Sequence, residues 1–231
     1  MREIVLDTET TGFDPETGDR LVEIGAVELV GHMPTGNQYH QYINPERDVP
    51  EDAVQVHGLT LDFLRDKPVF KNVAQDFLDF IGDAKLVIHN AAFDMKFLNA
   101  ELRWQDMPQI DYSRAIDTLE IARKKFPGSP ASLDALCRRF NIDNSARTLH
   151  GALLDSEILA EVYLELIGGR QPDLVLASAS NDRVDSASES EAWRPKPRPK
   201  KLASRVTPEE SKAHAEFVTK LGENALWGRF N

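Results

Sequence analysis

Four acidic side chains stand next to apolar segments, where an unpaired carboxylate is costly to bury. Asp7 and Glu9 end the first apolar segment, Asp94 follows the segment LVIHN by four residues, and Asp155 lies in a long apolar, helix-like segment. Converging carboxylates repel one another, and divalent cations relieve that repulsion. Hard oxygen ligands suit Mg²⁺ or Mn²⁺, and two such ions can bind both the attacking and the leaving oxygen of a phosphodiester. The pattern therefore predicts a site for two Mg²⁺ or Mn²⁺ ions.

A histidine stands beside the last of these acids. His150 precedes Asp155 by five residues, at or just before the expected start of a helix. A neutral imidazole takes up a proton near pH 7, so His150 is a candidate general base. Plainer explanations remain open, because such an acid can be a surface charge or a helix cap and such a histidine can be a cap or a packed side chain. We interpret Asp111, Asp117 and Asp134 as turn or cap residues.

The elements that must position these residues follow from the hydropathy pattern. Strands are predicted at 3–7, 21–30 and 37–44, with turn chemistry in GHMPTGN before the third, and a buried strand at 85–90. Side chains at i and i+2 of a strand point to the same face. Asp7 and Glu9 can therefore aim at one point if the first strand continues that far.

Helices are predicted between and after these strands. The apolar spacing indicates helices at 70–81, 91–103, 132–140 and 150–169, a strand and a helix within 113–126, and a short helix or turn at 50–58. Ser132 is the expected N-cap of one helix, and Gly168–Gly169 the expected end of another. Antiparallel strands followed by strands alternating with helices predict an α/β fold with a mixed sheet flanked by helices.

Composition excludes several classes of protein. The 231 residues contain no run of 18 apolar residues, so neither a membrane helix nor a membrane partner is expected. The N-terminus has no basic segment followed by an apolar one, so a signal peptide is not expected either. The single cysteine, Cys137, is expected to pack in the core. These features indicate a cytoplasmic protein. The net charge of −11 argues against gripping nucleic acid by bulk charge.

The composition changes after residue 170. Residues 1–170 carry 17 Lys and Arg against 29 Asp and Glu, whereas 171–231 carry 10 against 9. Residues 177–205 are rich in Ser, charged residues and Pro, which predicts a flexible linker. TPEE at 207–210 has the pattern of a capping box, and Phe217 and Leu221 follow on one face of the helix that it predicts. The expected organisation is a domain at 1–170, a linker at 171–205 and a helical segment at 206–231.

Three motifs carry a family resemblance. The chain resembles the DEDDh 3′–5′ exonucleases, which have a ribonuclease H-like fold, in three motifs: DTETTG, HNAAFD and HGALLD. The resemblance extends to three segments that lie between these motifs in the usual order: VEIGAVEL, VHGLT and SLDALCRRF. The resemblance covers about residues 2–168. The four residues between His150 and Asp155 are typical of the histidine subtype, since the tyrosine subtype places Tyr where this chain has Gly151.

The resemblance implies a five-stranded mixed sheet and a role for each matching residue. It implies that Asp7, Glu9, Asp94 and Asp155 are metal ligands and that His150 is the base. It also implies that the terminal nucleotide is contacted by residues of the first motif, by His57 in VHGLT with Asp52 before it, and by the acid of the third motif: Asp7, Thr8, Glu9, Thr10, Gly12, Asp52, His57 and Asp155. Asp52 departs from the Glu that the family often has, and His57 could instead cap a helix end.

Within the family, the chain most resembles the proofreading subunits of bacterial DNA polymerase III. That resemblance implies removal of mispaired 3′-terminal nucleotides from single-stranded or frayed DNA as 5′-monophosphates. It also implies docking on the polymerase alpha subunit through 206–231, and the residues expected to make the contact are Phe217, Leu221 and Trp227. QPDLVL at 171–176 resembles a sliding-clamp motif, with Gln171, Leu174 and Leu176 as anchors, or is plain linker. The alternatives are an RNA-trimming exonuclease of the same family and a non-catalytic scaffold.

Overall fold

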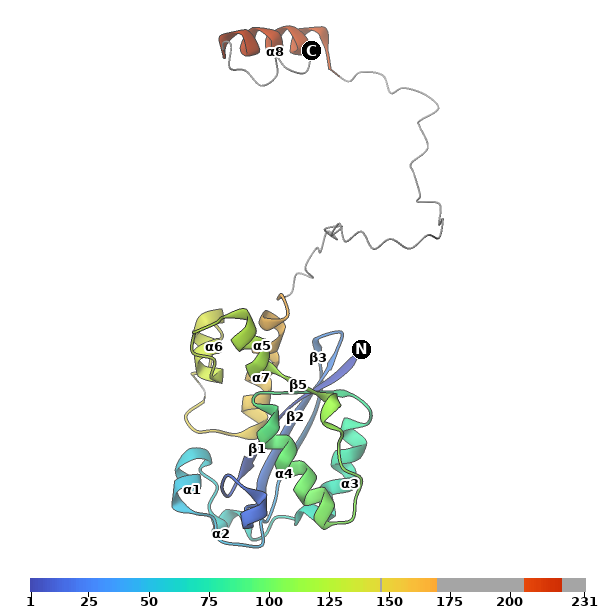
Figure 1. Ribbon diagram of the computed structural model, residues 1–231, viewed down its shortest axis with the longest axis vertical. Coiled ribbons are helices and arrows are strands. Elements are labelled where there is room, and N and C mark those ends of the chain that lie inside the picture. The colour runs from blue at the N-terminus through green and yellow to red at the C-terminus, as the bar shows by residue number, and fades with distance from the viewer. Residues whose placement is uncertain (146, 170–205, 222–231) are drawn as a thin grey trace, which may run out of the picture. The chain divides into compact units, whose positions relative to one another are not determined.

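A computed structural model describes residues 1–145, 147–169 and 206–221 of the chain (Figure 1). The chain divides into two units, Met1–Leu176 and Ala177–Asn231. The predicted linker at 171–205, the clamp motif and Trp227 lie outside the described residues. The roles expected for Gln171, Leu174, Leu176 and Trp227 therefore stay predictions. The domain boundaries at 170 and 205 stay predictions as well.

A five-stranded mixed sheet forms the centre of the first unit. Its strands are β1 (Arg2–Thr10), β2 (Leu21–Val30), β3 (Met33–Tyr42), β4 (Lys85–Ile88) and β5 (Ala115–Asp117), in the order β3-β2-β1-β4-β5. The strands β1 to β3 pair antiparallel, β4 pairs with β1 in parallel, and β5 pairs with β4 in parallel. The predicted mixed five-stranded sheet is confirmed.

Several strand boundaries differ from the prediction, most of all the end of β1 and the start of β3. β1 continues to Thr10, three residues beyond the predicted end, so Asp7 and Glu9 both lie within the strand. β3 begins at Met33 rather than at residue 37, because Gly31 and His32 close the turn with positive φ angles, while Gly36, whose φ is also positive, lies within the strand where its register with β2 shifts. The turn residues at 34–37 are therefore part of an exposed edge strand.

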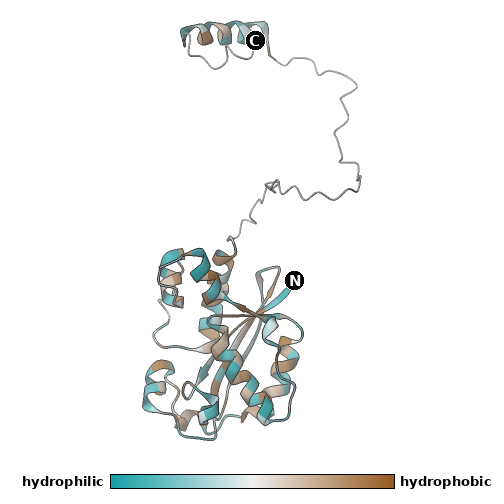
Figure 2. Ribbon diagram, in the orientation of Figure 1, coloured by the Kyte–Doolittle hydropathy of each residue, from teal (hydrophilic) through white to brown (hydrophobic). Residues whose placement is uncertain are grey.

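Helices cover both faces of the sheet (Figure 1). On one face α3 (Phe70–Ile81) and α4 (Ala91–Trp104) pack on Ile4 and Leu6 of β1. On the other face α5 (Thr118–Lys125), α6 (Leu133–Phe140) and α7 (Ala152–Leu166) pack on Val5 and Val27. In Figure 2 the ribbons of α3 and α6 carry both brown and teal stretches, as expected of helices with one buried face. The core is therefore split by the sheet into two layers.

Short elements and caps complete this unit. The short elements are η1 (Pro15–Thr17), α1 (Glu51–His57), α2 (Leu61–Leu64) and η2 (Tyr112–Arg114). Ser132 caps α6, and Asp111 and Asp117 cap η2 and α5, all as predicted. The predicted helix at 150–169 is α7, and both glycines after it have positive φ angles. Cys137 is fully buried, as expected.

The second unit contains α8 (Pro208–Lys220), which is described by itself. Its predicted capping box is present: Thr207 Oγ1 accepts from Glu210 N at 3.2 Å, and Thr207 N donates to Glu210 Oε2 at 2.8 Å. Phe217 and Leu221 keep 59% and 47% of their surface exposed. In the part of the chain that the structure describes, no helix has the length and apolar character needed to cross a membrane.

Candidate active site

Strand alternation sends the acids of β1 to one face and Thr8 to the other. Val5, two residues before Asp7, packs with the α7 layer, so Asp7 and Glu9 belong to the face that α7 covers. Thr8 points to the α4 side, where its hydroxyl donates to Asp94 Oδ1 at 2.7 Å. The end of β1 therefore carries Asp7 and Glu9 on the α7 side and contacts Asp94 on the α4 side.

The close approach of α7 to β2 positions Asp155. Gly25 of β2 is the direct partner of Asp7 of β1. A Cβ on Gly25 would lie 2.1 Å from Leu153 N and 2.2 Å from Ala152 C, so only glycine lets the first turn of α7 rest on the sheet. Ser156 Oγ donates to Gly25 O at 2.9 Å and fixes this contact. Asp155 consequently lies beside Asp7.

Asp117 fixes the start of the helix that carries Asp94. Asn90 precedes α4 in a left-handed conformation, with φ 68°. Asp117 accepts from Asn90 N at 3.2 Å and from Ala91 N at 3.1 Å, besides capping α5. Asp94, 3% exposed, follows within the first turn of α4. A residue predicted only as a cap thus also anchors the element that holds a candidate ligand.

A pocket of about 970 Å³ opens at this end of the sheet. All but one of the residues predicted for catalysis, metal binding and nucleotide contact line it: Asp7, Thr8, Glu9, Thr10, Gly12, Asp52, His57, Asp94 and His150. The exception is Asp155, which is 2% exposed and is not among the lining residues. Further lining residues that the sequence analysis did not single out include Phe13, which is 85% exposed, and Phe93.

The negative charge of the clustered carboxylates is not fully balanced by nearby positive side chains, and their pKa values are raised. Burial raises the pKa of Asp7 well above its usual value, and the charges of Asp94, Glu9 and Asp155 raise it further. Burial followed by the charge of Asp155 raises the pKa of Glu9 to about 8. Burial raises the pKa of Asp94 to about 7 against the effect of the Thr8 hydrogen bond. This donor set of crowded oxygens fits hard divalent cations, which would stabilise the ionised forms.

The candidate base lies at the edge of this cluster. One ligand atom from each of Glu9, His150 and Asp155 lies within 4.8 Å of the others, and His150 Nδ1 is 3.6 Å from Asp155 Oδ2. Burial and the nearby Arg147 guanidinium lower the pKa of His150. The ring is therefore neutral at pH 7, which is the state that a proton acceptor needs.

Arg147 is the main residue that the sequence analysis missed. Its Nε donates to Asp155 Oδ1 at 2.5 Å and one terminal nitrogen donates to Asp155 Oδ2 at 2.8 Å. The other terminal nitrogen donates to Asp134 Oδ1 at 3.0 Å. The prediction that Asp134 is a turn or cap residue was wrong, because it lies within α6 and binds this guanidinium.

His57 combines the two roles that the sequence left open. Its Nδ1 accepts from Leu59 N at 3.0 Å, just after α1 ends, so the ring does satisfy the chain at the helix end. Its Nε2 is buried and makes no hydrogen bond to any residue that the structure describes. Burial lowers the pKa of His57. A neutral ring that uses Nδ1 as an acceptor carries its hydrogen on Nε2, which leaves a donor at the pocket.

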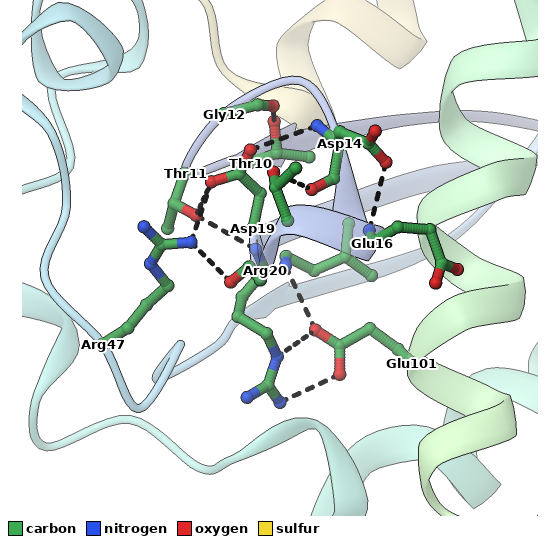
Figure 3. A network of polar contacts seen from close by, with 12 residues as sticks. Thr10, Thr11, Gly12, Asp14, Glu16, Asp19, Arg20, Arg47 and Glu101 are labelled. Carbon is green, nitrogen blue, oxygen red and sulfur yellow. Dashed lines mark hydrogen bonds and ion pairs between the residues drawn. The ribbon is translucent and has the colours of Figure 1, made fainter.

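A polar network holds the loop that forms the rim of the pocket (Figure 3). Thr10 Oγ1 donates to Gly12 O at 2.6 Å, and Asp19 accepts from Asp14 N at 3.1 Å and from Arg47 at 2.8 Å. A Cβ on Gly12 would lie 2.3 Å from Asp19 Oδ2, so the loop needs glycine there. The rim that faces a ligand is therefore preformed.

Residues 4–163 match the Exonuclease family, RNase_T. The chain belongs to this exonuclease family. Members of the DEDDh branch of this exonuclease family depend on divalent metal ions.

Known proteins resemble the chain over nearly its whole length. It is 50% identical over 228 residues to DNA polymerase III subunit epsilon of Rickettsia felis, covering 97% of this chain and 99% of that one. It is 45% identical over 236 residues to DNA polymerase III subunit epsilon of Escherichia coli K12, covering 98% and 97%.

Solved exonuclease structures resemble the fold. The complex of Exonuclease X with 5′ overhanging duplex DNA matches with a TM-score of 0.58 and 27% identity, over 71% of this chain and 90% of that one. The nuclease domain of 3′hExo, a DEDDh family member bound to rAMP, matches with a TM-score of 0.62 and 21% identity, over 72% and 91%. The predicted ribonuclease H-like exonuclease fold is confirmed.

Proposed function

We propose that this chain is the proofreading 3′–5′ exonuclease subunit of a bacterial DNA polymerase III, and that it removes mispaired 3′-terminal nucleotides from DNA. The similarity to epsilon subunits at 45–50% identity over nearly the full length carries this proposal. The pocket adds chemical support, because Asp7, Glu9, Asp94 and His150 all line it. A non-catalytic scaffold would have no need of this acidic cluster beside a neutral histidine.

Asp7, Glu9, Asp94 and Asp155 are the proposed metal ligands, for two Mg²⁺ or Mn²⁺ ions. Bound cations would supply positive charge that stabilises the phosphate and the leaving oxygen. His150 accepts a proton from the attacking water, since its ring is neutral and lies beside Glu9 and Asp155. The water oxygen attacks the phosphorus of the last phosphodiester, and the bond from phosphorus to the 3′ oxygen of the preceding nucleotide breaks. That oxygen takes up a proton and becomes the new 3′ hydroxyl, and the terminal nucleotide is released as a 5′-monophosphate.

The rest of the pocket is proposed to hold the terminal nucleotide. Thr8, Thr10 and Gly12 supply backbone from the preformed rim, and His57 offers Nε2–H as a donor. Asp52, exposed in the first turn of α1, also lines the pocket. A mispaired end unstacks at lower cost than a paired one, so it enters this pocket more often. Selection then needs little reading of the base.

The partners are proposed to be the polymerase alpha subunit, through 206–231, and the sliding clamp, through 171–176. α8 supports the first contact, because Phe217 and Leu221 are exposed apolar residues one helical turn apart. An acidic catalytic unit gains little affinity for DNA by charge, and a tether to a DNA-bound partner replaces it through effective concentration. We place the reaction in the bacterial cytoplasm, which the single buried thiol suits.

A degradation assay tests the proposed reaction. Purified protein is given primers with a paired, a mispaired or an RNA 3′ end, in Mg²⁺ or in EDTA, and the released nucleotides are identified. We expect deoxynucleoside 5′-monophosphates, fastest from the mispaired end, and no release in EDTA. Faster release from the RNA end would instead support the RNA-trimming alternative.

Deletion of 206–231 tests the proposed partner. The truncated chain should keep its exonuclease activity, because every described residue of the pocket lies before residue 151. It should no longer co-purify with the polymerase subunit. Retained co-purification would contradict the assignment of this segment.

A further inference from the structure

Arg147 covers the acid that is absent from the pocket wall. Its guanidinium binds both oxygens of Asp155, at 2.5 and 2.8 Å, and the Arg147 side chain is only 9% exposed. This is the parallel two-bond geometry of the strong arginine–carboxylate pairs. The negative charge of Asp155 is therefore balanced by Arg147, and His150 Nδ1 lies 3.6 Å from the same carboxylate.

The other three acids of the cluster have no such partner. Within the described ranges, no cationic side chain forms an ion pair with Asp7, Glu9 or Asp94; the side-chain hydrogen bond that Asp94 accepts comes from the neutral hydroxyl of Thr8. Arg147 thus places one positive charge where the proposed metal site needs a ligand. A divalent cation and a guanidinium on one small carboxylate would repel each other strongly in a buried setting.

The same guanidinium also engages the candidate base. One terminal nitrogen of Arg147 lies 3.0 Å from His150 Nδ1 and 3.3 Å from His150 Nε2. Because a guanidinium can only donate hydrogen bonds, the unprotonated nitrogen of the imidazole is the acceptor. A ring nitrogen that accepts from arginine cannot take a proton from water at the same time. Arg147 therefore blocks a metal ligand and the base together.

We propose that Arg147 is a built-in counter-ion, which occupies Asp155 and His150 in the metal-free protein and is displaced from both when a divalent cation binds. This inference rests on the proposed metal site. Asp134 gives the displaced side chain a partner, because it binds another nitrogen of Arg147 at 3.0 Å and is 45% exposed. The His150 backbone stays in place, since its amide donates to Val56 O at 3.0 Å. Only side chains have to move.

The affinity for Mn²⁺ tests this competition without any measurement of activity. The full chain, stripped of metal, is titrated with Mn²⁺ and the free ion is followed by electron paramagnetic resonance. Arg147→Met removes the competing charge and keeps an apolar stem. It should tighten Mn²⁺ binding by about tenfold or more, because one buried charge close to the ion is removed. Arg147→Lys, which keeps the charge but loses the fork, should bind Mn²⁺ with an affinity between those of the wild type and Arg147→Met.

Thermal unfolding in EDTA and in Mn²⁺ supplies the second measurement. In EDTA, Arg147→Met should unfold at a lower temperature than the wild type, because Asp155 loses its counter-ion. In Mn²⁺ the difference should shrink or reverse. Arg2→Met is the matched control: it breaks the 2.5 Å ion pair with Glu28 at the far end of β1, and should lower the unfolding temperature equally with and without Mn²⁺.

The outcomes separate this inference from the proposed function. If the wild type binds Mn²⁺ and Arg147→Met binds it equally or more weakly, Arg147 supports Asp155 instead of competing for it, and the inference is overturned. Should Arg147→Met fail to fold, an Arg147→Lys affinity at or below the wild type overturns it as well. If the wild type binds no Mn²⁺, the metal site itself is wrong.

Discussion

Asp7 on β1 and Gly25 on β2 are paired directly across the sheet, and the backbone of α7 crosses over Gly25 at a distance that leaves no room for a side chain. This contact joins residues that are far apart in the sequence. It fixes how close Asp155, in the first turn of α7, comes to Asp7. A glycine with no chemistry of its own therefore sets the geometry of the acidic cluster.

Gly25→Ala should separate these elements. The new methyl group would collide with the backbone of Ala152 and Leu153, so α7 must shift or the strand must bend. We expect the free energy of unfolding to fall by about 1–3 kcal/mol, as in other overpacked cores, and Mn²⁺ binding to weaken. Urea denaturation in EDTA measures the first effect. Gly151→Ala, where an added Cβ meets nothing within 4 Å, is the control, and an equal loss in both variants would contradict this role.

Asp7→Asn should stabilise the metal-free protein while removing its activity. The pKa of Asp7 is raised by burial and by three neighbouring acids, which means that its ionised form is unfavourable in the folded state. A neutral amide relieves that repulsion, and we expect about 1–2 kcal/mol of added stability in EDTA. Asp111→Asn, which alters an exposed cap, serves as the control. A less stable Asp7→Asn protein would contradict the repulsion.

Stability without metal should fall as the pH rises. The pKa is about 8 for Glu9 and about 7 for Asp94 in the folded protein, both above the ordinary values of about 4 in an unfolded chain. Between these limits the folded state binds more protons than the unfolded state, so the free energy of unfolding decreases with pH. The penalty is absent below about pH 4 and complete above about pH 8.

Thermal unfolding in EDTA across this pH range measures the effect. The unfolding temperature should decline from pH 5 to pH 8, and saturating Mg²⁺ should flatten the decline because it favours the ionised carboxylates. A rise over the same range in EDTA would show that the acids are compensated by groups other than a metal.

His150→Ala should reduce turnover far more than DNA binding. The ring is neutral and lies 3.6 Å from Asp155, where it can accept a proton, whereas most of the pocket that would hold the nucleotide is lined by other residues. We expect kcat to fall by about 10²–10⁴, the usual contribution of a general base, with KM little changed. A large rise in KM with kcat intact would assign His150 to binding.

The alternation of residues along β1 made the acidic end of this strand predictable. Apolar residues of β1 point to both buried layers, so a strand that runs on through Asp7 and Glu9 has to put them at the edge of a core. Helix α3 was also predictable to the residue, because its apolar positions repeat with the helical period. Local patterns were sufficient in both cases.

Arg147 and Gly25 show where sequence patterns stop. Arg147 lies in an irregular segment, and its importance comes from folding back on an acid eight residues away. Gly25 resembles any glycine in a strand until α7 is placed over it. Asp117 likewise reaches back to α4 through backbone amides 26 and 27 residues distant. These contacts leave no periodic pattern in the sequence, and only the assembled fold shows them.

Anomalous diffraction from crystals soaked with Mn²⁺ and a nucleoside 5′-monophosphate tests the central claim most directly. The claim is that Asp7, Glu9, Asp94 and Asp155 together hold divalent cations beside His150. We predict two anomalous peaks bounded by these four carboxylates, with the Arg147 guanidinium no longer on Asp155. Peaks located elsewhere, with all four carboxylates free of metal, would contradict the account.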